Sequence, residues 1–200
     1  HRRSIPSWSG EETGFDTSIG GIRADFQWWC HFLPKWNGVS LLLELQFSPD
    51  LLASDASLVG FGGVCDQSWI SELWPEAVWK QAHRSQRVSL PFLELYALTA
   101  TLCSFANRLQ RKRLLFRSDS KTAVDALLAG FSRDPLMLAL IREIHFVSVM
   151  HSFTILPRFI PGKLNDVPDS LSRLQIDRFR QLMPQADKCP TPTVFPTLRC

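Results

Sequence analysis

The sequence has few cysteines, no long apolar run and no strong charge imbalance. Its five cysteines are an odd number without a Cys-x-x-Cys pair, which argues against a zinc site or a disulfide framework and fits a reducing intracellular setting. The densest apolar stretch, residues 41–47, is interrupted by Glu44 and Gln46, so no membrane-spanning helix is expected. The chain begins at His1 without the features of a signal peptide, and we expect a fragment of a longer product.

The overall composition is that of an ordinary globular domain. Hydrophobic residues make up 45% and charged residues 20% of the 200 residues, which argues against disorder over the whole chain. The net charge of +3 permits nucleic acid as a partner but does not require it, because the distribution of the charge matters more than its sum. There are no internal repeats.

Three zones are expected along the chain. Residues 1–47 are irregular, without a self-contained fold, and fit the end of a preceding domain. Residues 48–175 alternate between strand and helix patterns. Residues 176–200 predict a linker or an extended tail, since four of the 13 prolines follow Leu182.

The central zone predicts an α/β fold in which helices flank a mixed sheet of five strands. Ser89 and Pro91 are typical of a helix start, Gly130 of a helix end, and Pro75 interrupts the third expected strand. Strands are expected at residues 51–57, 60–65, 69–83, 114–118 and 153–160, and helices at residues 89–108, 120–129, 135–150 and 166–174.

Four carboxylates lie near the ends of these elements: Asp55, Glu94, Asp119 and Asp169. Any one of them alone is more often a helix cap or a turn former. Converging carboxylates repel one another and favour a divalent cation, and hard oxygen ligands select Mg²⁺ or Mn²⁺. Two such ions about 3.5–4 Å apart can stabilise the attacking and leaving oxygens of a phosphodiester.

The strings around these acids resemble the ribonuclease H superfamily, specifically the domain attached to retrotransposon reverse transcriptases. The DIRS-type (tyrosine-recombinase) group is the nearest resemblance, followed by gypsy-like elements. The aromatic stretch at residues 25–38 also resembles the segment that joins polymerase to ribonuclease H in the DIRS group. The matching strings are SDASLVGFGGV (54–64), LELYAL (93–98), RSDSKTAV (117–124) and IPGKLNDVPDSLSR (160–173).

This resemblance implies an RNase H-like fold and hydrolysis of the RNA strand of an RNA–DNA hybrid, with an attached reverse transcriptase domain. It implies two Mg²⁺ ions, replaceable by Mn²⁺, with Asp55 bridging both, Glu94 and Asp119 completing one site and Asp169 holding the other. The products would carry 3′-hydroxyl and 5′-phosphate ends. Two departures stand out: Pro168 replaces the usual Ala, and the mobile histidine of cellular enzymes has no counterpart.

Basic and polar residues near the acids are candidate nucleic-acid contacts. Arg113 and Arg117 belong to a basic cluster that could follow phosphates, although a solvated helix end explains such a cluster equally well. The remaining candidates are Lys163 and Arg173 for phosphate, and Ser57, Ser120 and Asn165 for sugar hydroxyls.

Two other functions remain open. The chain could be a different nuclease of the superfamily, such as an integrase that cuts DNA. It could also be a catalytically inactive or host-adopted fragment that only binds nucleic acid or a protein.

Overall fold

The computed structural model describes residues 19–35, 48–49, 51–83 and 89–197. The chain divides into two compact units, His1–Lys35 and Trp36–Cys200. The first unit contains helix α1 (Ile19–Phe32) and the short 3-10 helix η1 (Leu33–Lys35). The prediction that residues 1–47 are irregular is therefore wrong for α1, where Trp28 and Phe32 stack one helical turn apart.

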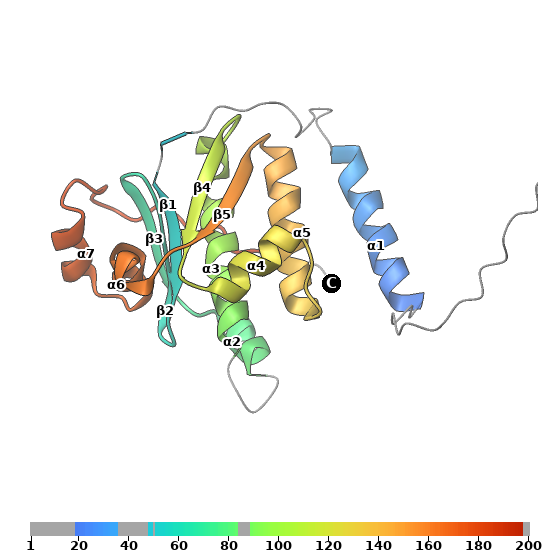
Figure 1. Cartoon of the computed structure of the whole chain (residues 1–200), viewed down its shortest axis with the longest axis horizontal. Helices are drawn as coiled ribbons and strands as arrows, with labels where there is room; N and C mark the ends of the chain where they lie inside the picture. The colour runs from blue at the N-terminus through green and yellow to red at the C-terminus, as the bar shows by residue number, and fades with distance from the viewer. Residues whose placement is uncertain (1–18, 36–47, 50, 84–88, 198–200) are drawn as a thin grey trace, which may run out of the picture. The chain divides into compact units, whose positions relative to one another are not determined.

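A mixed five-stranded sheet forms the centre of the second unit (Figure 1). Its strand order is β3-β2-β1-β4-β5; β1, β2 and β3 pair antiparallel, whereas β4 pairs parallel to β1 and β5. The strands are β1 (Leu52–Ala56), β2 (Gly60–Cys65), β3 (Ser68–Leu73), β4 (Arg113–Ser118) and β5 (Thr154–Phe159). The predicted α/β fold, with helices flanking a mixed five-stranded sheet, is confirmed.

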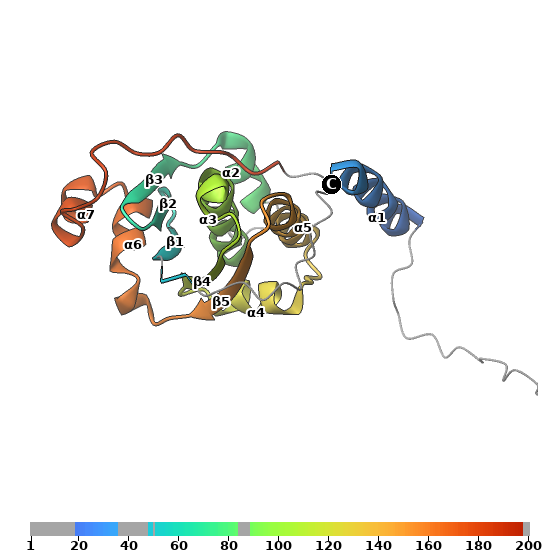
Figure 2. The ribbon, with the colours of Figure 1, turned by 90° about the horizontal axis from the view of Figure 1, so that it is seen from above.

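Helices cover both faces of this sheet. Figure 2 shows α6 and α7 on one side of β1 to β3, with α3 and α5 on the other. The helices are α2 (Glu76–Ala82), α3 (Leu90–Phe105), α4 (Lys121–Ala129), α5 (Pro135–Met150), α6 (Asp166–Ser172) and α7 (Ile176–Leu182), with 3-10 turns η2 (Ala106–Arg108) and η3 (Gly162–Leu164). No helix in the described ranges has the length and apolarity needed to cross a membrane.

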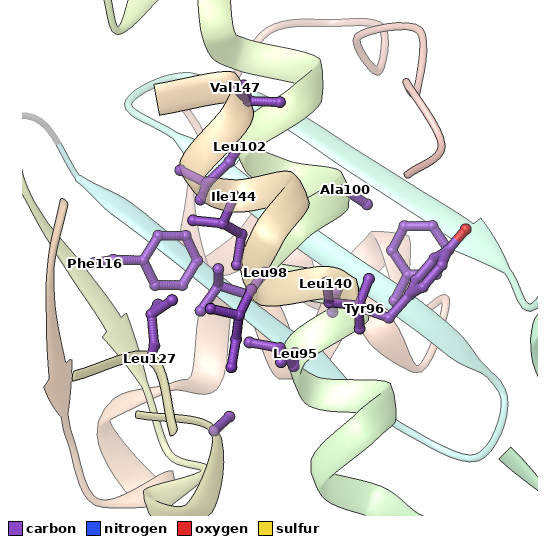
Figure 3. Packing of buried hydrophobic residues seen from close by; sticks show 14 of the residues in the cluster. Leu95, Tyr96, Leu98, Ala100, Leu102, Phe116, Leu127, Leu140, Ile144 and Val147 are labelled. Atoms are coloured by element: carbon purple, nitrogen blue, oxygen red, sulfur yellow. The ribbon is translucent and has the colours of Figure 1, made fainter. Parts of the chain in front are cut away.

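The larger core lies between the sheet and helices α3, α4 and α5. α3 is apolar nearly all round because it is packed against the sheet on one side and α5 on the other. Figure 3 shows Leu98 of α3, Phe116 of β4 and Ile144 of α5 within this cluster. A central helix buried to this degree can hold a side chain at a fixed position relative to the strand ends.

A smaller core lies on the opposite face, under α6 and α7. Ala53 and Val64 of the sheet pack there against Leu171 of α6 and Phe179 of α7. Consecutive β1 residues Leu52 and Ala53 belong to different cores, as the period of two in a strand requires. This second core fixes α6 against β1 and β2.

Two predictions are wrong: the length of the third strand and the linker expected from residue 176. β3 ends at Leu73, and residues 76–82 of the expected strand form α2 instead. Pro75 ends the strand and lies at the N-cap of this helix. The expected linker from residue 176 instead forms α7 and then runs along β3, where the Thr191 amide donates to the Trp69 carbonyl at 2.8 Å. Its Phe179 and Met183 are buried, so this segment is part of the fold.

Candidate metal centre

Asp55 lies near the carboxyl end of β1, with only 4% of its surface exposed. Its Oδ2 accepts a hydrogen bond from Ser172 Oγ at 2.5 Å, and its Oδ1 accepts one from Asn165 Nδ2 at 3.1 Å. Both donors belong to the segment that forms α6 and its N-cap. Helix α6 therefore fixes the orientation of this carboxylate.

Asp119 follows the last residue of β4 directly. Because β1 and β4 are parallel neighbours, their carboxyl ends meet at the same edge of the sheet, beside Asp55. The chain turns here into α4, whose N-cap Ser120 accepts a hydrogen bond from the Ala123 amide. The expected helix start at residue 120 is thus confirmed, and Asp119 is held at the junction of strand and helix.

Glu94 comes from the other side of the sheet, in the first turns of α3 between buried Leu93 and Leu95. Its Oε2 is inaccessible to solvent and has no hydrogen-bond partner. Asp55, Glu94 and Asp119 each place one carboxylate oxygen within 4.8 Å of the other two. Three elements distant in sequence therefore bring three carboxylates together.

Burial is the main cause of a raised pKa in all three acids. Burial raises the pKa of Glu94 to about 9, with further contributions from the charges of Asp55 and Asp119. Burial also raises the pKa of Asp55 to about 7, against the lowering effect of the Ser172 hydrogen bond. The pKa of Asp119 is raised, mainly by burial. The site therefore disfavours three negative charges unless a cation is present.

Asp169 lies in α6, next to this group but with different partners. Its carboxylate accepts a hydrogen bond from Arg173 Nε at 2.8 Å and lies 3.7 Å from Arg178 Nη1. It is close enough for its charge to raise the pKa of Asp55 and of Asp119. The structure thus brings three of the four predicted acids into one cluster and places the fourth beside it, paired with arginine.

Asn165, predicted as a sugar contact, instead bridges the acids. Its side chain is 1% exposed, and Nδ2 donates to the Ser54 carbonyl, to Asp55 Oδ1 and to Asp119 Oδ1. Its own Oδ1 is buried without a hydrogen-bond partner. An amide that donates to two carboxylates at once sets their separation and partly offsets their repulsion.

The other predicted polar contacts differ in availability. Ser57 is buried, and its hydroxyl donates to the Ser172 carbonyl at 2.7 Å and accepts from the Val59 and Gly60 amides, so it holds a turn. Because the Ser57 hydroxyl already makes these hydrogen bonds within the protein, it is poorly available for the predicted sugar contact. Ser120 is half-buried as the cap of α4, whereas Lys163 is exposed on η3, the turn that follows β5.

The predicted arginines fall at three places. Arg173 is paired with Asp169, as described above. Arg117 is exposed near the carboxyl end of β4, two residues before Asp119. Arg113 begins β4, at the end of the strand away from the acids, which separates it from the cluster by about 20 Å at the usual rise per residue. Arg113 is therefore badly placed to contact the phosphate that the acids would act on.

Two residues of the site were not predicted. Ser172 bonds Asp55, although it lies in the Leu-Ser-Arg string that carries the resemblance. Gly162 lies so close to Asp119 that an added Cβ would be 3.1 Å from Oδ2. Gly162 also lies in the string 160–173 that carries the resemblance, and its place there was the available signal.

The ligand chemistry of the cluster fits a hard divalent cation. All its donor atoms are carboxylate oxygens, without His or Cys, and this set suits Mg²⁺ or Mn²⁺ better than zinc. The unpartnered Oε2 of Glu94 is a buried acceptor that a cation would satisfy. None of three comparisons, with protein-family models, with curated proteins and with solved structures, finds a match to this chain.

Proposed function

We propose that the chain is a metal-dependent nuclease with an RNase H-like fold that hydrolyses the RNA strand of RNA–DNA hybrids. The observation that carries the proposal is the convergence of Asp55, Glu94 and Asp119 within 4.8 Å, with Asp169 beside them. The mixed five-stranded sheet is compatible with that fold. The sequence strings described above supply the choice of substrate and the attached reverse transcriptase domain.

Asp55, Glu94 and Asp119 would hold one Mg²⁺ or Mn²⁺ ion, and Asp55 with Asp169 a second. When bound, such a pair activates water and stabilises the charge on the attacking and leaving oxygens of a phosphodiester. The donor set and the unpartnered Oε2 of Glu94 support this assignment. Arg173 and Arg178 beside Asp169 would make the second ion bind more weakly than the first.

The chain's own residues prepare the site for this chemistry. Ser172 and Asn165 fix both oxygens of Asp55, so the carboxylate does not reorganise when charge develops. With a pKa of about 9, Glu94 carries a proton at neutral pH in the absence of a cation. Metal binding would therefore release protons and become tighter as the pH rises.

The test is cleavage of a labelled RNA–DNA hybrid in Mg²⁺ or Mn²⁺ by the parent chain and by Asp119→Asn. Loss of one ligand should reduce the rate by about 10²–10³-fold or more, as removal of one group that stabilises transition-state charge does in other enzymes. Asp125→Asn is the matched control, because Asp125 is exposed on the adjacent α4 and no acid of the cluster contacts it.

Duplex DNA and single-stranded RNA are assayed in parallel. Cleavage confined to the RNA strand of the hybrid, lost in Asp119→Asn and kept in Asp125→Asn, would support the proposal. Cleavage of duplex DNA would indicate a DNA-cutting nuclease of the same superfamily. A folded chain that binds the hybrid without cutting it would overturn the proposed activity in favour of a binding role.

A further inference from the structure

One region of the sheet on the α6 side has no helix over it in the described structure. α6 packs on β1, β2 and β3, while α4 joins the core on the opposite face through Ala123 and Leu127. Side chains of β4 and β5 that point away from the larger core are consequently exposed, among them Leu156 of β5. This open face continues the surface of α6 toward the edge strand β5.

Arg117 of β4 and Arg158 of β5 lie side by side on this open face. They are direct partners in the parallel register, and Arg117 is also the partner of Ala53 on β1. Ala53 faces the smaller core under α6, so both arginines point to the α6 side of the sheet. Both side chains are exposed.

Two adjacent cations on neighbouring strands destabilise a sheet unless an anion compensates for them. Among the residues that the structure describes, neither Arg117 nor Arg158 makes an ion pair. By contrast, four other basic side chains have acidic or carbonyl partners: Lys80, Arg173, Arg178 and Arg180. The fold therefore places two guanidinium groups together and leaves their charge for an external ligand.

The pair lies close to the acid cluster and on the same side of the sheet as Asp55. Ala53 and Asp55 are two residues apart on β1, and Arg117 and Asp119 are two residues apart at the end of β4. Two residues along a strand correspond to about 6.6 Å. A nucleic-acid strand bound by the two arginines would therefore extend toward the acid cluster, which begins at Asp119, two residues beyond Arg117.

We propose that Arg117 and Arg158 form a phosphate clamp for the backbone of a nucleic-acid duplex, next to the acid cluster but separate from it. This inference rests on the proposed function and names the surface along which its substrate lies. Guanidinium groups suit the task because they bind phosphate oxygens in a bidentate manner and remain charged at every accessible pH. The clamp would position the duplex without contacting the metals.

The test measures binding of a labelled RNA–DNA hybrid at a series of salt concentrations, in an Asp119→Asn background so that cleavage does not interfere. Each phosphate contact that is lost should reduce the magnitude of the slope of log K against log salt by about 0.9. Arg117→Gln and Arg158→Gln should each have this effect, and the double variant roughly twice as much. Lys188→Gln, which removes one exposed charge near the opposite edge strand β3, should leave the slope unchanged.

Lysine variants and stability measurements separate the clamp from a folding defect. Arg117→Lys and Arg158→Lys keep a point charge, so they should retain most of the slope while losing affinity through the bidentate geometry. The glutamine variants should melt no lower than the parent, because they remove a repulsion. In the otherwise native chain, the double glutamine variant should raise KM for cleavage and leave kcat nearly unchanged.

The outcomes distinguish this inference from the proposed function. An unchanged salt slope in the double variant, in a chain that binds and cuts the hybrid, would overturn the clamp and leave the nuclease standing. A reduced slope in a chain that binds but does not cut would support the clamp and overturn the activity. A parent chain that does not bind the hybrid would overturn both.

Discussion

Two groups of carboxylates lie near one end of the same sheet, and their surroundings are opposite. Asp166 and Asp169, on α6, have arginine partners, with Arg178 Nη2 at 3.0 Å from Asp166 and Arg173 Nε at 2.8 Å from Asp169. Asp55, Glu94 and Asp119 form no ion pair with a basic side chain within the described part of the chain. Charge is balanced internally on α6 and left unbalanced in the cluster.

The difference shows where an external cation is needed. An exposed carboxylate paired with arginine contributes little to stability and can exchange partners easily. A buried carboxylate without a cationic partner is costly, and the raised pKa values of Asp55 and Glu94 express that cost. The cluster is therefore the part of the site whose properties should depend most strongly on metal.

Glu94→Gln should have the largest effect on cleavage, because it removes one carboxylate ligand from the acid cluster. Cleavage of the hybrid should fall by about 10²–10³-fold at saturating Mg²⁺, since an amide is a poor ligand for a hard cation. Glu76→Gln is the control: Glu76 is an exposed acid on α2, paired with Lys80 at 2.6 Å. Equal rates for both variants would show that the cluster has no special role.

Gly62→Ala should disturb the packing of α6 on the sheet, which connects the acids of α6 to the acid cluster through the Ser172–Asp55 hydrogen bond. A Cβ at Gly62 would lie 2.3 Å from Leu171 Cβ and 2.8 Å from the Ser172 amide, so α6 would have to move away from the sheet. We expect a loss of about 1–3 kcal/mol of stability from overpacking. Cleavage should fall by about 10–100-fold, because Ser172 would no longer orient Asp55.

Gly130→Ala controls for the loss of a glycine as such. Gly130 ends α4 with φ +64, and a Cβ there meets nothing nearer than His145 Nε2 at 3.9 Å. Strain from the left-handed backbone should lower its melting temperature without changing the activity of the folded fraction. If Gly62→Ala kept full activity, the Ser172 contact to Asp55 would not matter for the site.

The pH dependence of stability should sharpen the comparison further. The pKa of Glu94 is raised to about 9 in the folded chain, so above its unfolded value of 4.5 the unfolded state binds fewer protons than the folded state. Stability of the metal-free chain is therefore lost as the pH rises from about 4.5 toward 9. The melting temperature of Glu94→Gln, relative to the parent, should rise by several degrees between pH 5 and pH 8.

Mg²⁺ provides the check on this pH effect. Saturating Mg²⁺ should remove most of the advantage of Glu94→Gln at pH 8, because the cation stabilises the parent's charged carboxylates. Calorimetric melting of both chains with and without the ion measures the difference directly. A parent whose melting temperature at pH 8 did not respond to Mg²⁺ or Mn²⁺ would contradict a metal centre in the cluster.

The acid cluster was predictable from local patterns, because each acid is fixed by an element that the sequence reveals. Asp55 and Asp119 end apolar strands, and Glu94 interrupts an apolar helix. The parallel pairing of β1 with β4 brings Asp55 and Asp119 together, and the packing of α3 on β1 adds Glu94. Local patterns do not specify the partners of each acid, which is why Asn165 was predicted to contact sugar and not the carboxylates.

The errors arise where long-range packing decides. α7 was hidden by the prolines that follow it, although its Phe179 packs against Trp69, in a buried cluster that also contains Met183 and Ala186 beyond the helix. The Ser172 contact depends on α6 docking against a strand 117 residues earlier in the chain. In α1, clustered aromatic residues conceal the helical spacing of Trp28 and Phe32, which stack on each other.

Arg178→Gln, which changes the arginine-paired acids of α6, should have the smallest effect on stability and activity. Arg178 is exposed and bridges Asp166 at 3.0 Å and Asp169 at 3.7 Å, so its loss should change the melting temperature by no more than about 2 °C. Removing a competing cation beside Asp169 should lower the Mg²⁺ concentration for half-maximal cleavage by about twofold. A titration of cleavage rate against Mg²⁺ measures this shift, with Lys80→Gln on α2 as the control that loses a similar exposed pair. A higher Mg²⁺ requirement in Arg178→Gln would mean that the arginine holds Asp169 in position for the metal and does not compete with it.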